Sequence, residues 1–368
     1  MTNSRVIDGF RAVVPAGGAG TRLWPVSRVG SPKFLHDLTG TGRTLLQGTV
    51  DRLAPLAGPQ GVVVVTGAAH ERAVREQLPE LGAGAVLAEP SPRDSMAAIG
   101  LAAAVLAERE GDVVLGSFAA DHVIEGDGFA EAVRQGVVAA RAGYVTTIGI
   151  AATGPSTAFG YIELGDSLGL DDAPGARHVA AFTEKPDALT AARYLEAGRH
   201  RWNAGMFLVR AQVLLEHLVR LQPTLHDGLR RIAAAWDTER RDEVMAEVWP
   251  GLTKIAIDHA IAEPVAAEGG VAVVPGDFAW DDIGDVASLR DMLTGDPAVL
   301  GAVDDVLTID APGALVAARG GRVVTVLGVP DVVVLDTPDA VLVTTRERAQ
   351  EVKRVVDALR ERGRTDLL

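Results

Sequence analysis

The sequence predicts an α/β protein with a Rossmann-like, mostly parallel sheet, followed by a small β-rich domain. Three observations predict this class. Apolar runs of strand length alternate with segments of helical period from residue 11 to about residue 150. Hydrophobic residues make up 48% of the 368-residue chain, enough for a large packed core. Near residue 297 the composition changes to a segment dense in Val, Asp and Gly.

Strands and helices are expected to alternate along the first 150 residues. The expected strands are Ala12–Val14, Val62–Thr66, Ala85–Ala88, Val113–Ser117 and Tyr144–Gly149. The expected helices are Leu45–Leu53, Arg72–Leu78, Met96–Arg109 and Phe129–Arg141. Ligands of such sheets bind beyond the carboxyl ends of the strands, so the residues that follow each strand are the first candidates for a site.

The change of composition near residue 297 suggests two domains. We expect residues 1–296 to form the larger domain and residues 297–368 to form the smaller, β-rich one. Short β-like pieces occur in the smaller domain at Ala314–Ala317, Val323–Leu327 and Val332–Leu335, and a charged helix is expected at Arg346–Arg362. No long-period repeat is apparent. Packing or dimerisation is the default role of such a domain, and a homodimer is compatible with it.

Charge and composition exclude several classes of function. The formal net charge of −14 disfavours broad binding to nucleic acids or anionic membranes. The absence of cysteine excludes disulfides and thiolate metal sites, and it fits a reducing cytosol. Met1–Gly9 lacks the apolar core of a signal peptide, and no later apolar stretch reaches membrane-span length. We therefore expect a cytoplasmic protein with neither nucleic acid nor membrane as its partner.

A glycine-rich loop, residues 16–22, follows the first expected strand. Three glycines within four residues allow a sharp turn whose backbone N–H groups face an anion. Thr21 adds a hydroxyl donor, and Arg22 and Lys33 add two cations. The loop lacks the spacing of a P-loop, and Leu23 stands where a dinucleotide fingerprint needs its third glycine. An ordinary strand-to-helix turn is the alternative, but the added donors favour a triphosphate site.

Two acidic positions lie far apart in the sequence. Asp121 comes just after the fourth expected strand, and Asp281 and Asp282 follow an apolar segment near residue 280. Magnesium prefers one or two carboxylates with waters and phosphate oxygens, so two distant aspartates can share one ion. A helix cap or a turn is the alternative for each. His122 is expected to be a structural partner, because no second histidine has a suitable spacing.

The middle region contains groups that suit a sugar phosphate. Gly160 allows close approach of the backbone to a ligand. Glu184 can accept hydrogen bonds from sugar hydroxyls, Lys185 can bind a monophosphate, and Asn203 places an amide beside a strand. A surface ion pair explains Glu184 and Lys185 equally well when they are taken alone.

In this order the segments resemble the mannose-1-phosphate guanylyltransferases, also called GDP-mannose pyrophosphorylases. The motifs are G-G-x-G-T-R-L-W-P, P-K, A-D-H, F-G-Y-I-E, F-x-E-K-P, W-N-A-G-M-F and W-D-D-I-G, with residues 253–262 before the last, and they span residues 11–290. Residues 332–345 resemble the left-handed β-helical tail of the short, single-function members. The bifunctional form needs an added isomerase domain, for which 368 residues leave no room.

The resemblance implies transfer of GMP from GTP to α-D-mannose 1-phosphate, with Mg²⁺ as cofactor. It implies catalytic roles for Arg22 and Lys33 and metal ligands at Asp121 and Asp282. The implied nucleotide contacts are Ala16, Gly17, Gly18, Gly20, Thr21, Arg22 and Asp121. The implied sugar-phosphate contacts are Gly160, Glu184, Lys185 and Asn203.

Some positions depart from the family pattern. Arg93-Asp94-Ser95-Met96-Ala97 stands where the family commonly has R-N-T-A-P. Asp281 falls where a small or polar residue is usual, which favours Asp282 as the ligand. The alternatives are a nucleotidyltransferase for another hexose 1-phosphate and a non-catalytic sugar-nucleotide-binding regulator. Joint retention of the cations and both carboxylates speaks against a regulator, and the missing glycine disfavours a dinucleotide oxidoreductase.

Overall fold

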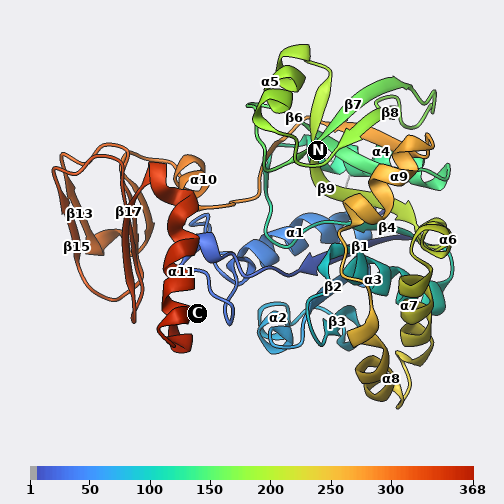
Figure 1. Ribbon diagram of the computed structural model, residues 1–368, viewed down its shortest axis with the longest axis horizontal. Coiled ribbons are helices and arrows are strands. Elements are labelled where there is room, and N and C mark those ends of the chain that lie inside the picture. The colour runs from blue at the N-terminus through green and yellow to red at the C-terminus, as the bar shows by residue number, and fades with distance from the viewer. Residues whose placement is uncertain (1–5) are drawn as a thin grey trace.

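The computed structural model describes residues 6–368, in which a large sheet lies between two layers of helices and a smaller β-domain follows (Figure 1). The first five residues of Met1–Gly9, where no signal peptide is expected, lie outside the described part. The sheet has nine strands in the order β3-β2-β1-β4-β9-β6-β10-β8-β7. Their bounds are β1 Phe10–Ala16, β2 Val62–Gly67, β3 Val86–Glu89, β4 Val114–Ser117, β6 Val145–Ala151, β7 Gly160–Ser167, β8 Arg177–Thr183, β9 His200–Arg210 and β10 Val271–Gly276.

Strand direction divides this sheet into two halves. The four strands from β3 to β4 are parallel, as the sequence predicts. Beyond them the sheet is mixed, because β9 is antiparallel to its neighbours β4, β6 and β7. The connection at 168–176 joins β7 to its antiparallel partner β8, and it is too short for the crossover that a parallel pair needs. The α/β class is confirmed. The antiparallel pairings lie in the half of the sheet where the strand–helix alternation of the sequence is least regular.

Alternate residues of each strand face opposite helical layers. Val13 and Val65 belong to the core under α3, α6 and α7, whereas Val14 and Val64 belong to the core under α1, α2 and α4. The bounds are α1 Leu45–Ala57, α2 Glu71–Gln77, α3 Asp94–Glu110, α4 Gly128–Arg141, α5 Ala188–Ala197, α6 Ala211–Leu221, α7 Pro223–Ala235, α8 Arg241–Val248 and α9 Glu263–Ala267. All four helices predicted before residue 150 are present, with ends that differ by a few residues.

The C-terminal region is built from short parallel strands stacked as coils. Ala298 pairs with Leu315, and Leu315 pairs with Val333, so one coil takes 17 or 18 residues. The strands are β12 Ala298–Gly301, β13 Val306–Ile309, β14 Leu315–Ala318, β15 Val324–Leu327, β16 Val332–Asp336 and the antiparallel β17 Val341–Thr345. The β-helix-like domain is confirmed, while its handedness stays a prediction.

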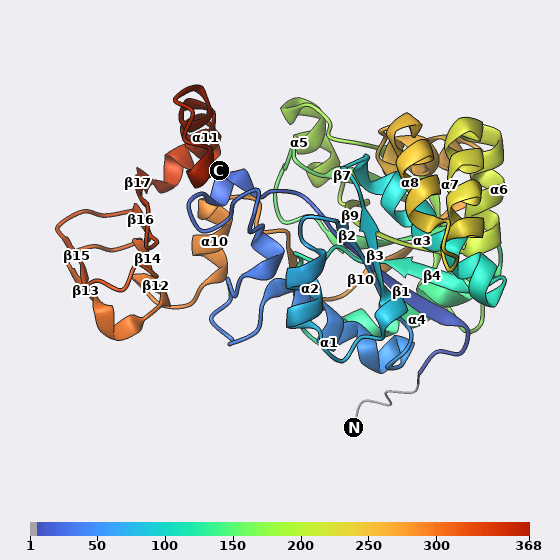
Figure 2. The same cartoon turned by 90° about the horizontal axis from the view of Figure 1, so that it is seen from below.

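The predicted terminal helix begins later than expected. Residues 346–351 form a 3₁₀ helix, and the α-helix α11 covers only Val352–Glu361. This helix and α10 (Val286–Met292) lie beside the loop that follows β1 (Figure 2). One apolar cluster combines Leu23 and Trp24 of that loop with Val286 of α10 and Val356 of α11. Packing is therefore continuous across residue 297, and the boundary at 296/297 stays a prediction. No helix within residues 6–368 is both long and apolar enough to cross a membrane.

Candidate active site

The glycine loop leaves β1 at the carboxyl edge of the parallel half of the sheet. Ala16 is buried, whereas Gly17 and Gly18 are exposed. Gly18 and Gly20 have φ values of 85° and 54°, which side chains rarely adopt. A Cβ at Gly20 would lie 2.6 Å from Ser27 Oγ and 3.2 Å from Lys33 Cβ. Glycine at this position therefore lets the loop pass directly against Lys33.

Lys33 is the centre of a group that we call the phosphate-side cluster, formed by Arg22, Lys33, Asp121 and Asp282. Its Nζ lies 3.0 Å from Asp121 Oδ2, and the two side chains are 11% and 17% exposed. The same ammonium donates to the backbone carbonyl oxygens of Asp282 and Ile283. Residues from three distant segments therefore meet around one cation.

A two-stranded ribbon explains how Asp121 and Asp282 come together. β5 (Val123–Glu125) pairs antiparallel with β11 (Ala279–Asp281), and Val123 lies opposite Asp281. Asp121 precedes one strand and Asp282 follows the other, so both leave the ribbon at the same end. The two aspartates that the sequence places 161 positions apart thus flank one ladder.

The donor set around this ribbon fits a magnesium ion. Asp281 Oδ1 accepts a hydrogen bond of 2.6 Å from the Ile283 N–H, so this carboxylate already stabilises the turn in which it lies. Burial raises the pKa of Asp281, with the neighbouring Asp282 charge adding to the shift. No group of three or more His, Asp or Glu side chains suited to a metal occurs within the described residues 6–368. Magnesium needs fewer, because waters and substrate phosphates complete its shell.

Arg22 lies on the far side of the same segment. A Cβ at Gly284 would lie 3.8 Å from Arg22 Nη2 and 3.3 Å from Asp282 Oδ1. Arg22 Nη1 donates to Gln350 Oε1 at 3.0 Å, a contact with the C-terminal domain. The structure therefore brings both predicted cations and both predicted carboxylates of the phosphate side into one neighbourhood.

The second group, the sugar-side cluster, consists of Gly160, Glu184, Lys185, Asn203 and Asp258. Gly160 opens β7 opposite Asn203 of β9. A Cβ at Gly160 would lie 2.4 Å from Glu184 Oε2 and 3.3 Å from Asn203 Cβ. A side chain at residue 160 would therefore force the Glu184 carboxylate to move from this position.

Lys185 and Glu184 form an ion pair of 2.8 Å with unequal exposure. The Glu184 side chain is 11% exposed and the Lys185 side chain is 63% exposed. The hydrogen bond to Glu184 raises the pKa of Lys185, with smaller contributions from Asp258 and Asp94. The carboxylate is therefore fixed, while the cation can reach toward a ligand.

Asp258 was missed as an individual residue by the sequence analysis. It accepts a hydrogen bond of 2.7 Å from Asn203 Nδ2, while Asn203 Oδ1 accepts one of 3.1 Å from Thr147 Oγ1. Burial, and then the Glu184 charge, raise the pKa of Asp258 to about 6. It begins a π-helical turn, Asp258–Ala262, a geometry frequent at functional sites. The motif around residues 253–262 was the available signal, but it did not indicate which residue meets Asn203.

Glu89 was also missed, although it follows the rule that found Asp121. It ends the buried strand β3 and is 8% exposed, and its Oε2 has no hydrogen-bond partner. Burial raises the pKa of Glu89 to about 7. Glu89 lies opposite Gly67 at the end of β2, two strands from the glycine loop. An unpaired buried carboxylate at this edge is available to a ligand.

A chain of aromatic contacts connects the two clusters. His122 meets Trp280 edge-to-face at 5.2 Å between ring centroids, and Trp280 meets Phe159 at 5.0 Å. Phe159 then meets Trp202 at 5.1 Å. These rings are the sequence neighbours of Asp121, Asp281, Gly160 and Asn203. Ring contacts therefore link the sequence neighbours of the two clusters, and His122 is a packing partner, as expected.

Backbone strain gathers around the same region. Asp94, Lys185 and Ile283 have φ values of 68°, 46° and 43°, which are unusual for residues with side chains. Asp94 lies in the segment that departs from the family pattern, and its own Oδ1 accepts from the Ser95 N–H at 2.9 Å. Ser95 Oγ in turn accepts from the Ile257 N–H, next to Asp258. The departing segment therefore supports the sugar-side cluster.

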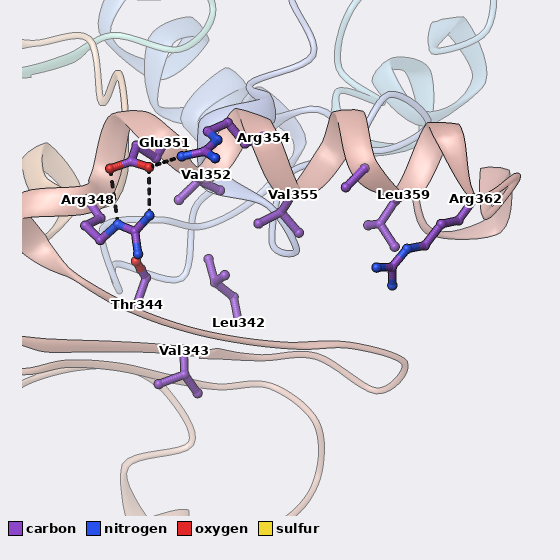
Figure 3. Close-up of a pocket in the computed structure, with 11 residues that line it drawn as sticks. Leu342, Val343, Thr344, Arg348, Glu351, Val352, Arg354, Val355, Leu359 and Arg362 are labelled. Atoms are coloured by element: carbon purple, nitrogen blue, oxygen red, sulfur yellow. Dashed lines mark hydrogen bonds and ion pairs between the residues drawn. The ribbon is translucent and has the colours of Figure 1, made fainter.

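A separate groove of about 440 Å³ lies between β17 and α11 (Figure 3). Leu342, Val355 and Leu359 form its apolar lining, and Glu351 lies between Arg348 and Arg354. No residue predicted for the active site lines this groove.

Comparison with known proteins agrees with the domain pattern. Residues 11–297 match the family model described as nucleotidyl transferase, and residues 304–359 match the MannoseP isomerase/GMP-like beta-helix domain. The xanthan biosynthesis protein XanB of Xanthomonas campestris and a mannose-1-phosphate guanylyltransferase of Escherichia coli are each 37% identical to this chain. Each comparison covers 96% of this chain and 74% of the relative, so the chain spans about three quarters of their length.

A solved structure is similar over almost the whole chain. The crystal structure of a mannose-1-phosphate geranyltransferase from Thermus thermophilus has a TM-score of 0.82 and 34% identity. The comparison covers 96% of this chain and 99% of that one. The chain belongs to the nucleotidyltransferase family, so the predicted fold, family and enzyme class are confirmed. The expected short, single-function form stays a prediction.

Proposed function

We propose that this nucleotidyltransferase transfers GMP from GTP to α-D-mannose 1-phosphate, giving GDP-mannose and pyrophosphate. The observation that carries the proposal is the presence of two unlike clusters whose sequence neighbours are linked by ring contacts. The phosphate-side cluster combines a glycine loop, two cations and two carboxylates, which suits a metal-bound triphosphate. The sugar-side cluster combines a buried acid, an amide and an exposed lysine, which suits a hexose phosphate.

The reaction needs no nucleophilic side chain. An oxygen of the sugar 1-phosphate attacks the α-phosphorus of GTP, and the bond from that phosphorus to the bridging oxygen of the β-phosphate breaks. Pyrophosphate leaves with the electron pair. The protein aligns two polyanions and neutralises developing charge, a task for Arg22 and Lys33 on one side and Lys185 on the other.

Asp121 and Asp282 would hold the magnesium ion. When bound, the ion supplies further neutralisation of phosphate charge. Lys33 already bridges the Asp121 carboxylate and the Asp282 carbonyl, so its ammonium keeps the two segments in register. The backbone N–H groups of Gly17, Gly18 and Gly20 would face the phosphates, with Thr21 adding its hydroxyl.

Base selection is supported by Glu89. Guanine presents two adjacent donors, the ring N1–H and the exocyclic amine, and an ionised carboxylate accepts from both. Adenine presents no such donor pair. The orphan Oε2 of Glu89 at the end of β3 would find its partner in guanine, while the triphosphate extends toward the loop after β1.

We propose further that the reaction takes place in the cytoplasm.

We propose also that two copies of the protein associate through the C-terminal domain. Several large apolar side chains of the β-helix-like domain are exposed: Val303, Leu307, Val323, Leu327 and Val343. Exposed apolar patches of this kind often mark protein contacts. Sedimentation equilibrium with wild-type protein and with a Leu327→Glu variant tests the association. A monomeric wild type would contradict it.

One assay tests the reaction itself. Purified protein with Mg²⁺ is incubated with each of four nucleoside triphosphates and with mannose, glucose or galactose 1-phosphate, while pyrophosphate release is followed. We expect the fastest release with GTP and mannose 1-phosphate. A preference for another hexose 1-phosphate would favour the same-fold alternative. Sugar-nucleotide binding without pyrophosphate release would favour the regulator.

A further inference from the structure

The C-terminal domain makes several polar contacts with the loop after β1. Trp24 Nε1 donates to the Leu367 carbonyl oxygen at 2.8 Å. Arg28 makes a two-pronged contact with Asp339 at 2.7 and 2.6 Å. Arg22 donates to Gln350 at 3.0 Å. The first two contacts dock the domain, whereas the third ends on a proposed catalytic residue.

Neighbouring groups fix the orientation of the Gln350 amide. Its Nε2 donates to Asp285 Oδ2, and an ionised carboxylate can only accept, so the amide oxygen must face Arg22. Asp285 is buried, and its other oxygen accepts from the Ala287 and Ser288 N–H groups at 2.8 and 3.1 Å. The acceptor offered to Arg22 is therefore held by the first turn of α10.

The segment that anchors Gln350 also carries the rest of the phosphate-side cluster. Asp285 lies three residues after Asp282, whose carbonyl oxygen accepts from Lys33. Residues 282–285 thus supply the Asp282 carboxylate and contact Lys33 through the Asp282 carbonyl oxygen. Through Asp285 and Gln350 they also contact Arg22. A guanidinium has five N–H donors, so one bond to Gln350 leaves others for a phosphate.

We propose that Gln350 is a positioning residue, through which the C-terminal domain orients Arg22 for phosphoryl transfer. The inference rests on the proposed function. A neutral amide suits this task, because it accepts a hydrogen bond without cancelling the charge of Arg22. A carboxylate there would pair with the guanidinium and hold it away from the substrate.

The test uses the full chain and three variants. Gln350→Met keeps the length of the side chain but removes both hydrogen bonds, and Gln350→Glu adds a charge. Asp339→Asn weakens the Arg28–Asp339 contact between the domains, which does not involve Arg22, and is the matched control. Turnover, KM for both substrates, GTP affinity and Tm are measured for each, and Gln350→Met is repeated on an Arg22→Ala background.

We expect kcat to fall roughly tenfold in Gln350→Met, the effect of one hydrogen bond to a charged group, with KM for GTP within about twofold. The kcat of Gln350→Glu should fall further, because its carboxylate pairs with Arg22 and also faces the Asp285 carboxylate. Asp339→Asn should stay within about twofold of wild type. On the Arg22→Ala background, Gln350→Met should cause no further loss, because the residue acts through Arg22.

The outcomes separate the two proposals. A wild-type protein with no turnover on any substrate pair contradicts the proposed function. Wild-type turnover with an unchanged Gln350→Met kcat overturns the positioning role. An equal loss in Asp339→Asn, or a full further loss on the Arg22→Ala background, overturns it also, since either shows general domain docking.

Discussion

The phosphate-side and sugar-side clusters are built in opposite ways. The phosphate-side cluster collects residues from three distant segments, and its central cation, Lys33, is largely buried and bonded on several sides. The sugar-side cluster grows from neighbouring strand ends, with a buried acid and an exposed lysine. A buried, fixed cation suits charge that develops during the reaction, whereas an exposed cation suits capture of a ligand. Variants of the first cluster should change turnover and variants of the second should change affinity.

The largest effect is expected at the two carboxylates of the phosphate side. Asp121→Asn and Asp282→Asn should each keep the fold and lose at least roughly a hundredfold in kcat, because an amide is a poor ligand for magnesium. Asp281→Asn should be milder, since that carboxylate accepts from the Ile283 N–H. Turnover as a function of magnesium concentration measures this. Near-normal rates of both variants at saturating magnesium would show that these two aspartates do not bind the metal.

Arg22→Lys comes next and tests the first cluster without the metal. Lysine keeps the charge but not the planar, two-pronged donation of a guanidinium. We expect kcat to fall by roughly ten- to a thousandfold, the range for loss of one oxyanion donor. GTP affinity, measured by calorimetry, should change much less. Weakened GTP binding with unchanged turnover would show that Arg22 only binds GTP. It would contradict the expected difference between the two clusters.

Lys185→Ala examines the other side. Loss of one charged hydrogen bond should raise KM for mannose 1-phosphate roughly ten- to a hundredfold, with KM for GTP little changed. Steady-state kinetics with each substrate varied in turn gives both values. If GTP affinity fell while the sugar phosphate bound normally, the two clusters would be assigned the wrong way round.

The smallest effect is expected at Glu89, where pH adds a second test. Ionised Glu89 is the acceptor for guanine, so kcat/KM for GTP should fall as pH drops through about 7. Glu89→Gln should flatten this profile and lower kcat/KM for GTP by roughly tenfold, with a smaller loss for ITP, which lacks the exocyclic amine. A profile unchanged by the substitution would exclude Glu89 from base recognition.

The same carboxyl gives a stability test with a fixed sign. Its pKa rises from 4.5 to about 7 on folding, so the folded chain binds the proton more tightly than the unfolded chain. Its contribution to stability is full below pH 4.5 and is lost as pH rises through about 7. Glu89→Gln should therefore gain Tm relative to wild type above neutral pH.

Strand-end reasoning predicted part of the candidate site because it depends on local sequence pattern. Asp121 follows a buried strand, and the glycine loop follows another, so both could be assigned from the sequence. Glu89 obeys the same rule and was overlooked. The meeting of Asp121 with Asp282 depends on β5 and β11, three-residue strands too short to give a period. Their pairing is a product of the tertiary fold.

Features that depend on contacts between distant parts of the chain could not be predicted from the sequence. The antiparallel direction of β9 follows from its partners and not from its composition, which reads as a strand in either direction. The coils of the C-terminal domain repeat every 17 or 18 residues through backbone pairing, yet their strands share no residue pattern that marks a period. Gln350 carries no signal of its own, because its role exists only once the two parts of the chain have docked.

The distance along the chain between Arg22 and Gln350 has a consequence for biosynthesis. The two residues are 328 positions apart. At ordinary rates of translation that interval takes on the order of half a minute. Arg22 therefore waits for its partner during the synthesis of almost the whole chain, whereas Asp282 precedes Gln350 by only 68 positions. A chain released before residue 350 would lack both the Gln350 contact and part of the apolar cluster that packs against Leu23 and Trp24, so the loop is completed only when the C-terminal domain is made.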